Sequence, residues 1–324
     1  MSVGILHLRW QTFADTNENG VERVRAYRGN RKLVYQPQRE WGWTIAAEIF
    51  CGGTAGGVYI ISVLPYLLFG DRIFLNGVFS SLVLLLASVL LLVIDANSIR
   101  RVPRTFFNTK SPLTLGAVSL SLFIIFLILT ISILYAGIAP LALYAVVCLG
   151  VTVSVLTIVY PGILMGLMKA IPIWSGSRPP LLLLSASLAS GSAVVTLVGG
   201  MDYVDSNLSR ITLWLLVIYG LFLSIYIILG SRGSRAAQIS VRQLFKGNLS
   251  LIFIIGVIAV GLIAPFVLFI IGIISSSASI SQVGSVLILV GGLLMRYSLI
   301  ASGVKTSVLS EDSITAIYWL DHRS

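Results

Sequence analysis

The chain has 324 residues, of which 57% are hydrophobic and 10% are charged, and its mean hydropathy is +0.98. Soluble domains carry about 25% charged residues. This composition therefore excludes a soluble globular protein and indicates a polytopic membrane protein.

Residues 1–42 form a polar, basic N-terminal arm. The arm has no apolar core segment, and the first apolar stretch after it is too long for a signal peptide, so we expect no cleavable signal here. Residues 43–303 hold the membrane domain, and residues 304–324 form a short polar C-terminal tail.

The membrane domain contains eight apolar stretches, and a membrane-spanning helix needs about 20 apolar residues. We therefore expect an all-α fold of eight transmembrane helices. The second stretch is short, and we expect its helix to continue through Asp95. The predicted spans are residues 43–69, 78–94, 113–136, 140–168, 181–199, 211–230, 249–274 and 283–303.

Lys and Arg residues are distributed unevenly between the two membrane faces that eight spans predict. The face that carries both termini, called side A from here on, receives 19 of them, and the opposite face receives two, Arg72 and Arg210. The net charge of +10 is thus explained by one face, and we expect no nucleic-acid partner. The positive-inside rule predicts that side A is cytoplasmic.

Cysteine and histidine give no support for a metal or haem site. Cys51 and Cys148 lie in different spans without a CxxC motif, and both are expected to be small buried residues. His7 and His322 lie near the termini, whereas a transmembrane haem b is usually held by histidines within the helices. We expect no haem and no metal in this chain.

Three charged residues fall within the apolar stretches: Glu48, Asp95 and Arg296. A charge at the centre of a membrane helix costs roughly 2.5–3.5 kcal/mol on insertion scales, so such residues mark functional or paired sites. With Tyr160, all three belong to the side-A half of the predicted bundle. We expect Arg296 to neutralise Glu48 or Asp95, and a purely structural ion pair between Glu48 and Arg296 is the alternative.

The sequence CGGTAGG follows Glu48 closely and removes side-chain bulk beside the carboxylate, at Gly52 and Gly56 among others. A neighbouring helix or a flat ligand could approach there. A hydroquinone releases two protons on oxidation, and a carboxylate as proton acceptor with a tyrosine as donor suits that chemistry. Glu48, Asp95 and Tyr160 are therefore candidate catalytic residues, and Glu48, Gly52, Gly56, Tyr160 and Arg296 candidate quinone-binding residues.

Two other function classes remain open on these residues alone. The same polar set could line a path in a secondary transporter, which would show inverted repeats with paired broken helices. We find no clear repeat of that kind. A structural anchor without a quinone is the third possibility.

The connection after the second span, DANSIRRVPRTFFNTKSP, is basic and carries two phenylalanines. It either docks an acidic partner subunit or is ordinary positive charge at a cytoplasmic face. For the docking role the candidate residues are Arg100, Arg101, Arg104, Asn108 and Lys110.

Four segments resemble the NrfD-like family, the membrane subunits of polysulfide reductase and related molybdopterin oxidoreductases. They are WGWTIAAEIFCGGTAGG at 41–57, NTKSPLTLGA at 108–117, YPGILMGLMKAIPIWSGSRPPLLLLSASLASGSA at 160–193 and GGLLMRYSLIASG at 291–303. The chain departs from the family where residues 96–99 replace its usual L-G-R-P and where Lys110 replaces a common Arg, which loses bidentate recognition.

The resemblance implies two four-helix bundles that bind menaquinone or a similar quinone without haem. Glu48 stands at the family's polar quinone position on the first helix, where some members carry His, and Tyr160 and Arg296 stand at the tyrosine and arginine of its motifs. It also implies a ferredoxin-like iron–sulfur subunit and a molybdopterin catalytic subunit as partners. The favoured terminal substrate is polysulfide or sulfur, with tetrathionate, thiosulfate or another oxyanion as alternatives.

The resemblance and the charge count disagree about orientation. We expect a multi-pass protein of the cytoplasmic membrane with both termini on the same side. Family members commonly turn the face corresponding to side A outward, toward the iron–sulfur partner, whereas the charges place it in the cytoplasm. A docked subunit covering side A would account for positive charge outside, so both orientations stay open.

Overall fold

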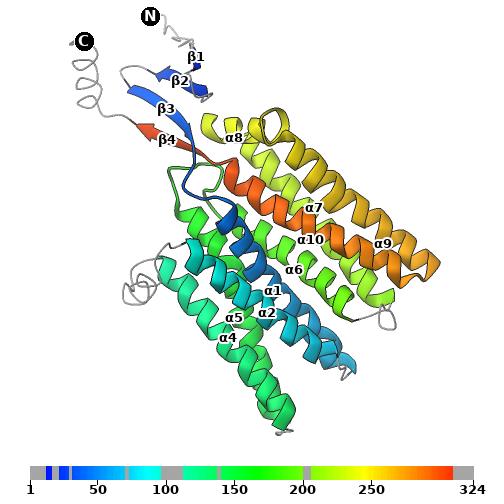
Figure 1. The fold of residues 1–324 in the computed structure, drawn as a ribbon. Helices are drawn as coiled ribbons and strands as arrows, with labels where there is room; N and C mark the ends of the chain where they lie inside the picture. The colour runs from blue at the N-terminus through cyan, green and yellow to red at the C-terminus, as the bar shows by residue number, and fades with distance from the viewer. Residues whose placement is uncertain are drawn as a thin grey trace, which may run out of the picture.

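The computed structural model describes residues 12–16, 22–28, 31–69, 73–95, 112–136, 140–199 and 206–308 (Figure 1). Eight of its helical segments are long and apolar enough to cross a membrane, which confirms the predicted all-α membrane fold. They are α1 (Trp43–Phe69), α2 (Ile73–Asp95), α4 (Pro112–Ala136), α5 (Pro140–Leu167), α6 (Arg178–Val198), α7 (Ser206–Ser231), η3 (Ile252–Ile263) continued by α9 (Ala264–Ser275), and α10 (Ala278–Ala301).

The helices form two groups, each with its own apolar core. In Figure 1, α1, α2, α4 and α5 make one group, and α6, α7, η3–α9 and α10 make the other. Tyr59, Phe74 and Phe123 lie in the core of the first group, and Phe269 and Met295 lie in that of the second. Helix α1 joins the groups because it also packs against α6 and α10.

Helices α1 and α6 approach so closely that their backbones touch. A Cβ on Gly57 would meet the carbonyl oxygen of Ser187, and a Cβ on Gly191 would meet the backbone of Gly57. Small residues allow this approach between membrane helices, where close packing replaces the hydrophobic effect as the source of association. The glycine and serine runs of the two helices thus fix the interface between the two groups.

The seventh span begins as a π-helix, η3, rather than as the continuous helix that apolar content alone suggests. Its last turn is closed by the N–H of Ala264, which donates to the carbonyl of Ala259. Pro265, which follows, has no N–H to continue an α-helical pattern. The α-helical part, α9, starts at this point.

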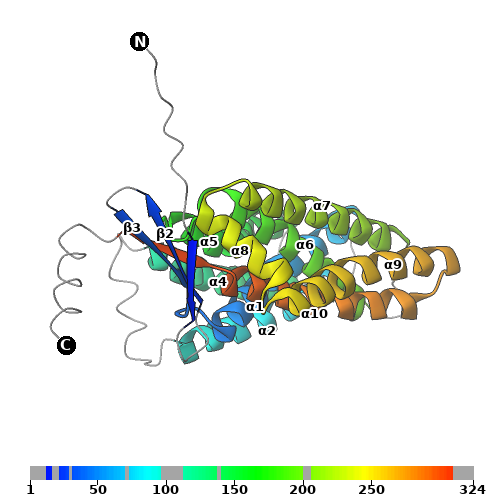
Figure 2. The same ribbon diagram turned by 90° about the horizontal axis from the view of Figure 1, so that it is seen from above.

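The largest departure from the sequence-based expectation lies at side A. The arm supplies β1 (Thr12–Thr16), β2 (Glu22–Arg28) and β3 (Arg31–Pro37), and the tail supplies β4 (Val304–Val308). They form an antiparallel sheet in the order β1-β2-β3-β4, so strands from opposite ends of the membrane domain pair directly. Figure 2 shows these strands gathered at one end of the helices.

A further helix that was not predicted, α8 (Arg235–Lys246), lies at the same end, between α7 and η3. It is amphipathic, and Ser234 caps its N-terminus by accepting a hydrogen bond from the N–H of Ala237. Ala236 of α8 packs with Tyr35 of β3 and Val304 of β4. The sheet is therefore attached to the helices on side A.

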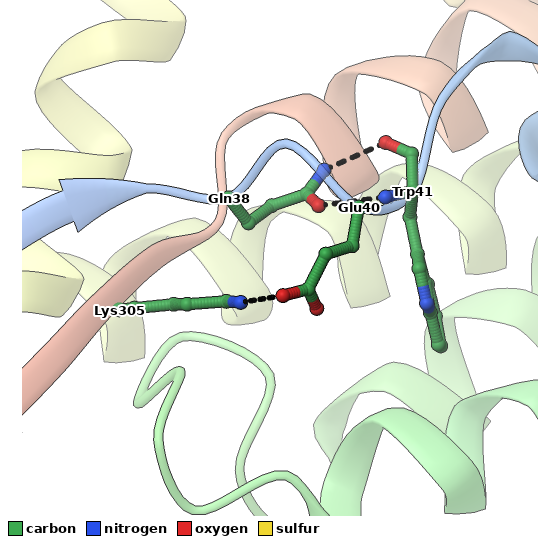
Figure 3. Close-up of polar contacts among 4 residues, drawn as sticks. All are labelled: Gln38, Glu40, Trp41 and Lys305. Carbon is green, nitrogen blue, oxygen red and sulfur yellow. Dashed lines mark hydrogen bonds and ion pairs between the residues drawn. The ribbon is translucent and has the colours of Figure 1, made fainter.

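Gln38 connects the sheet to the start of α1 (Figure 3). Its side-chain amide donates to the carbonyls of Trp41 and Ile300 at 2.8 and 3.1 Å and accepts from the N–H of Trp41 at 3.0 Å. Close by, the ammonium of Lys305 lies 2.6 Å from the carboxylate of Glu40. These contacts hold the entry of α1 against the exit of α10.

Candidate functional site

Glu48 is buried where α1, α2 and α5 meet, with only 5% of its surface exposed. The hydroxyl of Tyr160 donates to its Oε1 at 3.0 Å, and the hydroxyl of Ser88 lies 3.2 Å from both Oε1 and the backbone carbonyl oxygen of Glu48. Both hydrogen bonds reach Oε1, so Oε2 accepts none from the side chains that the structure describes. The predicted acid and tyrosine are thus in direct contact.

Glycines set the positions of both hydrogen-bond donors. The Tyr160 ring lies against Gly116 of α4, where a Cβ would collide with the ring. Ser88 of α2 lies against Gly52 of α1, where a Cβ would approach the hydroxyl to 2.8 Å. The absence of side chains at these two positions lets the donors reach the carboxylate.

The predicted quinone-binding glycines are covered by protein. Gly52 faces Ser88, and Gly56 faces Ile158 and the carbonyl of Ser154 on α5. Both glycines thus allow helices to pack closely around the carboxylate. Their assignment to a ligand stays a prediction.

Asp95 is the last residue of α2, and its side chain is exposed. It lies seven residues beyond Ser88, about 10 Å along the helix axis at 1.5 Å per residue. The structure therefore does not bring Asp95 into the contact made by Glu48 and Tyr160. Its carboxylate lies at the side-A end of α2.

Arg296 forms an ion pair with neither Glu48 nor Asp95, so that prediction was wrong. Its side chain is fully buried; Nη1 donates to the carbonyl of Gly292 and Nη2 to the hydroxyl of Ser187, both at 2.8 Å. Among the described residues the one ion pair joins Lys305 and Glu40. The rotation of α10 turns the guanidinium toward α6 and the ring of Phe50, 5.2 Å away, instead of toward Glu48.

Aromatic rings cover the side-A end above these residues. Trp41 stacks on the buried ring of Trp174 with centroids 5.3 Å apart, and Trp174 donates to the carbonyl of Leu299 at 2.9 Å. Trp43 stacks on Tyr297, the residue after Arg296, with centroids 4.0 Å apart. Trp43 is 47% exposed, as expected of an aromatic residue at the membrane interface.

Ser88 and Ser187, the partners of the two buried charged residues, were not predicted from the sequence. Ser88 precedes Asp95 by seven residues, so both lie on one face of α2, and that spacing was a usable signal. Ser187 was indistinguishable from the neighbouring serines of α6, which are explained by packing. The proposed docking residues Arg100, Arg101, Arg104, Asn108 and Lys110 lie outside the described residues.

A sequence model of the family described as polysulphide reductase, NrfD, matches residues 34–308. The chain belongs to this family. The C subunit of polysulfide reductase from Wolinella succinogenes is 25% identical over 300 residues, which cover 81% of this chain and 94% of the relative. The NrfD match begins within β3 and ends with β4, so it includes all eight spans and the strand pair that joins their ends.

NrfD membership and the eight spans identify this protein as a multi-pass membrane subunit of a molybdopterin oxidoreductase. All four segments that suggested the family contribute to the contacts described above. Helix α1 supplies Glu48, α5 supplies Tyr160, and α10 supplies Arg296. The fourth segment supplies Gly116, against which the Tyr160 ring packs.

Proposed function

We propose that this protein binds menaquinone or a similar quinone beside Glu48 and Tyr160 and passes electrons between the quinone and an iron–sulfur subunit. The observation that carries the proposal is the hydrogen bond from Tyr160 to a buried carboxylate. The bound quinone would supply two-electron, two-proton redox chemistry. The protein's own residues would hold its oxygens and handle its protons.

Glu48 fits the role of proton acceptor. Tyr160 and Ser88 hold Oε1 in place, which leaves Oε2 without a described donor and available to a quinol hydroxyl. A proton acceptor must lie within hydrogen-bond reach of the proton that it takes. Asp95, exposed at the end of α2, would then receive that proton on its way toward side A.

The iron–sulfur subunit is proposed to dock on side A, over the basic connection 96–111. The last residue of α2 and the first of α4 fix both ends of that connection at the face above Glu48. Its four cations favour an acidic partner surface, with an attraction that salt weakens. Reversing Arg100, Arg101 and Arg104 to Glu should release the partner while the membrane subunit still folds; co-purification of an unchanged complex would refute the docking role.

The molybdopterin subunit would select the terminal substrate. The name of the Wolinella succinogenes relative supports polysulfide, with sulfur, tetrathionate, thiosulfate or another oxyanion as alternatives. The family match favours this oxidoreductase role over the secondary transporter considered from sequence. We also propose the cytoplasmic membrane as its location, with both termini on side A, which the pairing of β3 with β4 supports.

The decisive experiment is Glu48→Gln in the purified complex. Glutamine keeps an oxygen for Tyr160 and Ser88 but cannot accept a proton, so quinol-linked turnover should fall about 100-fold or more, with the complex still assembled. Glu40→Gln, which removes an exposed carboxylate, is the matched control. Wild-type quinol kinetics in Glu48→Gln would refute the proposal.

A further inference from the structure

Helix α8 is held at the surface of the membrane by the spans on either side of it. Helix α7 ends at Ser231 and η3 begins at Ile252, so the segment between them leaves and re-enters the membrane at side A. Its buried face, which includes Ala237 and Leu244, packs on the protein. The opposite face, which includes Gln238, Arg242 and Phe245, is exposed.

An open groove of about 340 Å³ lies between the end of α7 and α8. Small-ligand sites have volumes of about 300–1,000 Å³, so the groove is large enough for a phospholipid headgroup. Two apolar side chains and two cations line it together with two uncharged polar residues. The lining residues are Ser231, Gln238, Val241, Arg242, Phe245 and Lys246.

The two cations of the groove have no described counter-charge. Arg242 and Lys246 are exposed, and neither forms an ion pair with a residue that the structure describes. The sequence from 206 to 310 contains no Asp or Glu at all. The groove therefore presents a local excess of positive charge that favours an anion.

Apolar groups beside the cations show what kind of anion suits the groove. Phe245 is 37% exposed, and its ring is held edge-on against Phe253 of η3 at a centroid distance of 5.4 Å. Leu229 of α7 is 45% exposed and Leu251, just before η3, is 70% exposed, as expected of lipid-facing residues. Cations and an exposed aromatic ring thus lie at the edge of a lipid-facing surface.

We propose that this groove binds the headgroup of an acidic phospholipid. Arg242 and Lys246 would bind the phosphate, and Val241 and Phe245 would contact the glycerol and the first part of an acyl chain. A protein partner is less well suited, because the spans next to α8 expose apolar residues, Leu229 and Leu251, as lipid-facing segments do. The inference does not depend on the proposed quinone site.

The test uses the full-length protein, delipidated in detergent. It is titrated with phosphatidylglycerol, phosphatidylcholine or inorganic phosphate, and native mass spectrometry counts the bound molecules. Arg242→Gln/Lys246→Gln is compared with Arg232→Gln/Arg235→Gln, which removes the same charge from the same segment outside the groove. Wild type and control should bind one phosphatidylglycerol tightly. The groove variant should bind it roughly 30-fold more weakly, the effect of two surface cations.

Phe245→Ser keeps both cations and should also weaken phosphatidylglycerol binding relative to the control. Equal retention of phosphatidylglycerol by the groove variant, or equal binding of phosphatidylcholine, would overturn the proposal. Competition by millimolar inorganic phosphate would reassign the groove to a free anion. Loss of a co-purifying protein subunit from the groove variant, with lipid retention unchanged, would reassign it to a protein interface.

Discussion

The hydroxyl of Tyr160 donates a 3.0 Å hydrogen bond to Oε1 of Glu48 and so connects α5 to α1 through a buried carboxylate. The two residues are 112 positions apart in the chain. Removing such a bond, so that a buried polar group is left without its partner, costs about 1–3 kcal/mol. The contact therefore both aligns two helices and defines the surroundings of the proposed proton acceptor.

Tyr160→Phe removes the hydroxyl and keeps the ring that packs on Gly116. We expect quinol-linked turnover to fall roughly 10- to 100-fold, because Glu48 loses the hydrogen bond that positions its carboxylate. Tyr144→Phe, at an exposed tyrosine on the same helix, is the control and should leave the rate unchanged. Steady-state quinol oxidation by the purified complex measures both, and equal rates in the two variants would contradict the assignment.

Ser187→Ala should destabilise the protein by about 1.5–3 kcal/mol, because it leaves Nη2 of the buried Arg296 without its hydrogen-bond acceptor. Ser185→Ala is the matched control: that serine is also buried in α6 but donates only to the carbonyl of Leu182 in its own helix. Thermal unfolding in detergent compares them. A similar midpoint shift in both would show that the Ser187–Arg296 bond contributes no special stability.

Gly57→Ala is expected to lower stability by about 1–3 kcal/mol, because the added methyl group meets the carbonyl of Ser187 and must push α1 away from α6. Gly42→Ala, just before α1, adds a methyl group where no heavy atom lies within 4 Å. The folded yield on size-exclusion chromatography and the unfolding midpoint should both drop only in Gly57→Ala. If both variants behave alike, the α1–α6 interface tolerates more separation than the structure indicates.

Gln38→Ala should cost about 2 kcal/mol, because it removes three hydrogen bonds from a largely buried amide between the sheet and the membrane helices. Glu40→Gln breaks the neighbouring ion pair with Lys305 and should cost less than about 1 kcal/mol, since Glu40 is 73% exposed. The unfolding midpoints of the two variants, measured by differential scanning calorimetry, test this order. A larger loss in Glu40→Gln would reverse our ranking of the two contacts.

The spans were predictable because lipid requires long apolar helices whatever they pack against. The depth of Glu48 was predictable for the same reason, since distance from a helix end follows from residue count. The direction in which a side chain points around its helix was not predictable. Arg296 lies five residues from the end of α10 and Glu48 five residues from the start of α1, yet Arg296 turns toward Ser187.

The sheet and α8 were missed for different reasons. Strand β4 follows β3 by more than 260 residues, so no local pattern in the arm indicates its partner. Helix α8 is short and flanked by glycines at 233 and 247, and its exposed face carries charge, so it resembled an ordinary polar connection. At the candidate site, Glu48 and Arg296 could be singled out because a charge inside a membrane span is costly. Their serine partners, Ser88 and Ser187, could not be, because those contacts depend on how each helix is rotated about its axis.

The pairing of β3 with β4 also constrains how the protein is made. Strand β3 is synthesised before the first span, and its partner emerges only after the eighth. During translation β3 therefore has one edge without its native neighbour until every helix has entered the bilayer. The sheet can therefore be completed only after all eight spans have been inserted. A protein cut before Val304 would keep its spans, but the edge of β3 would stay open to pairing with other molecules.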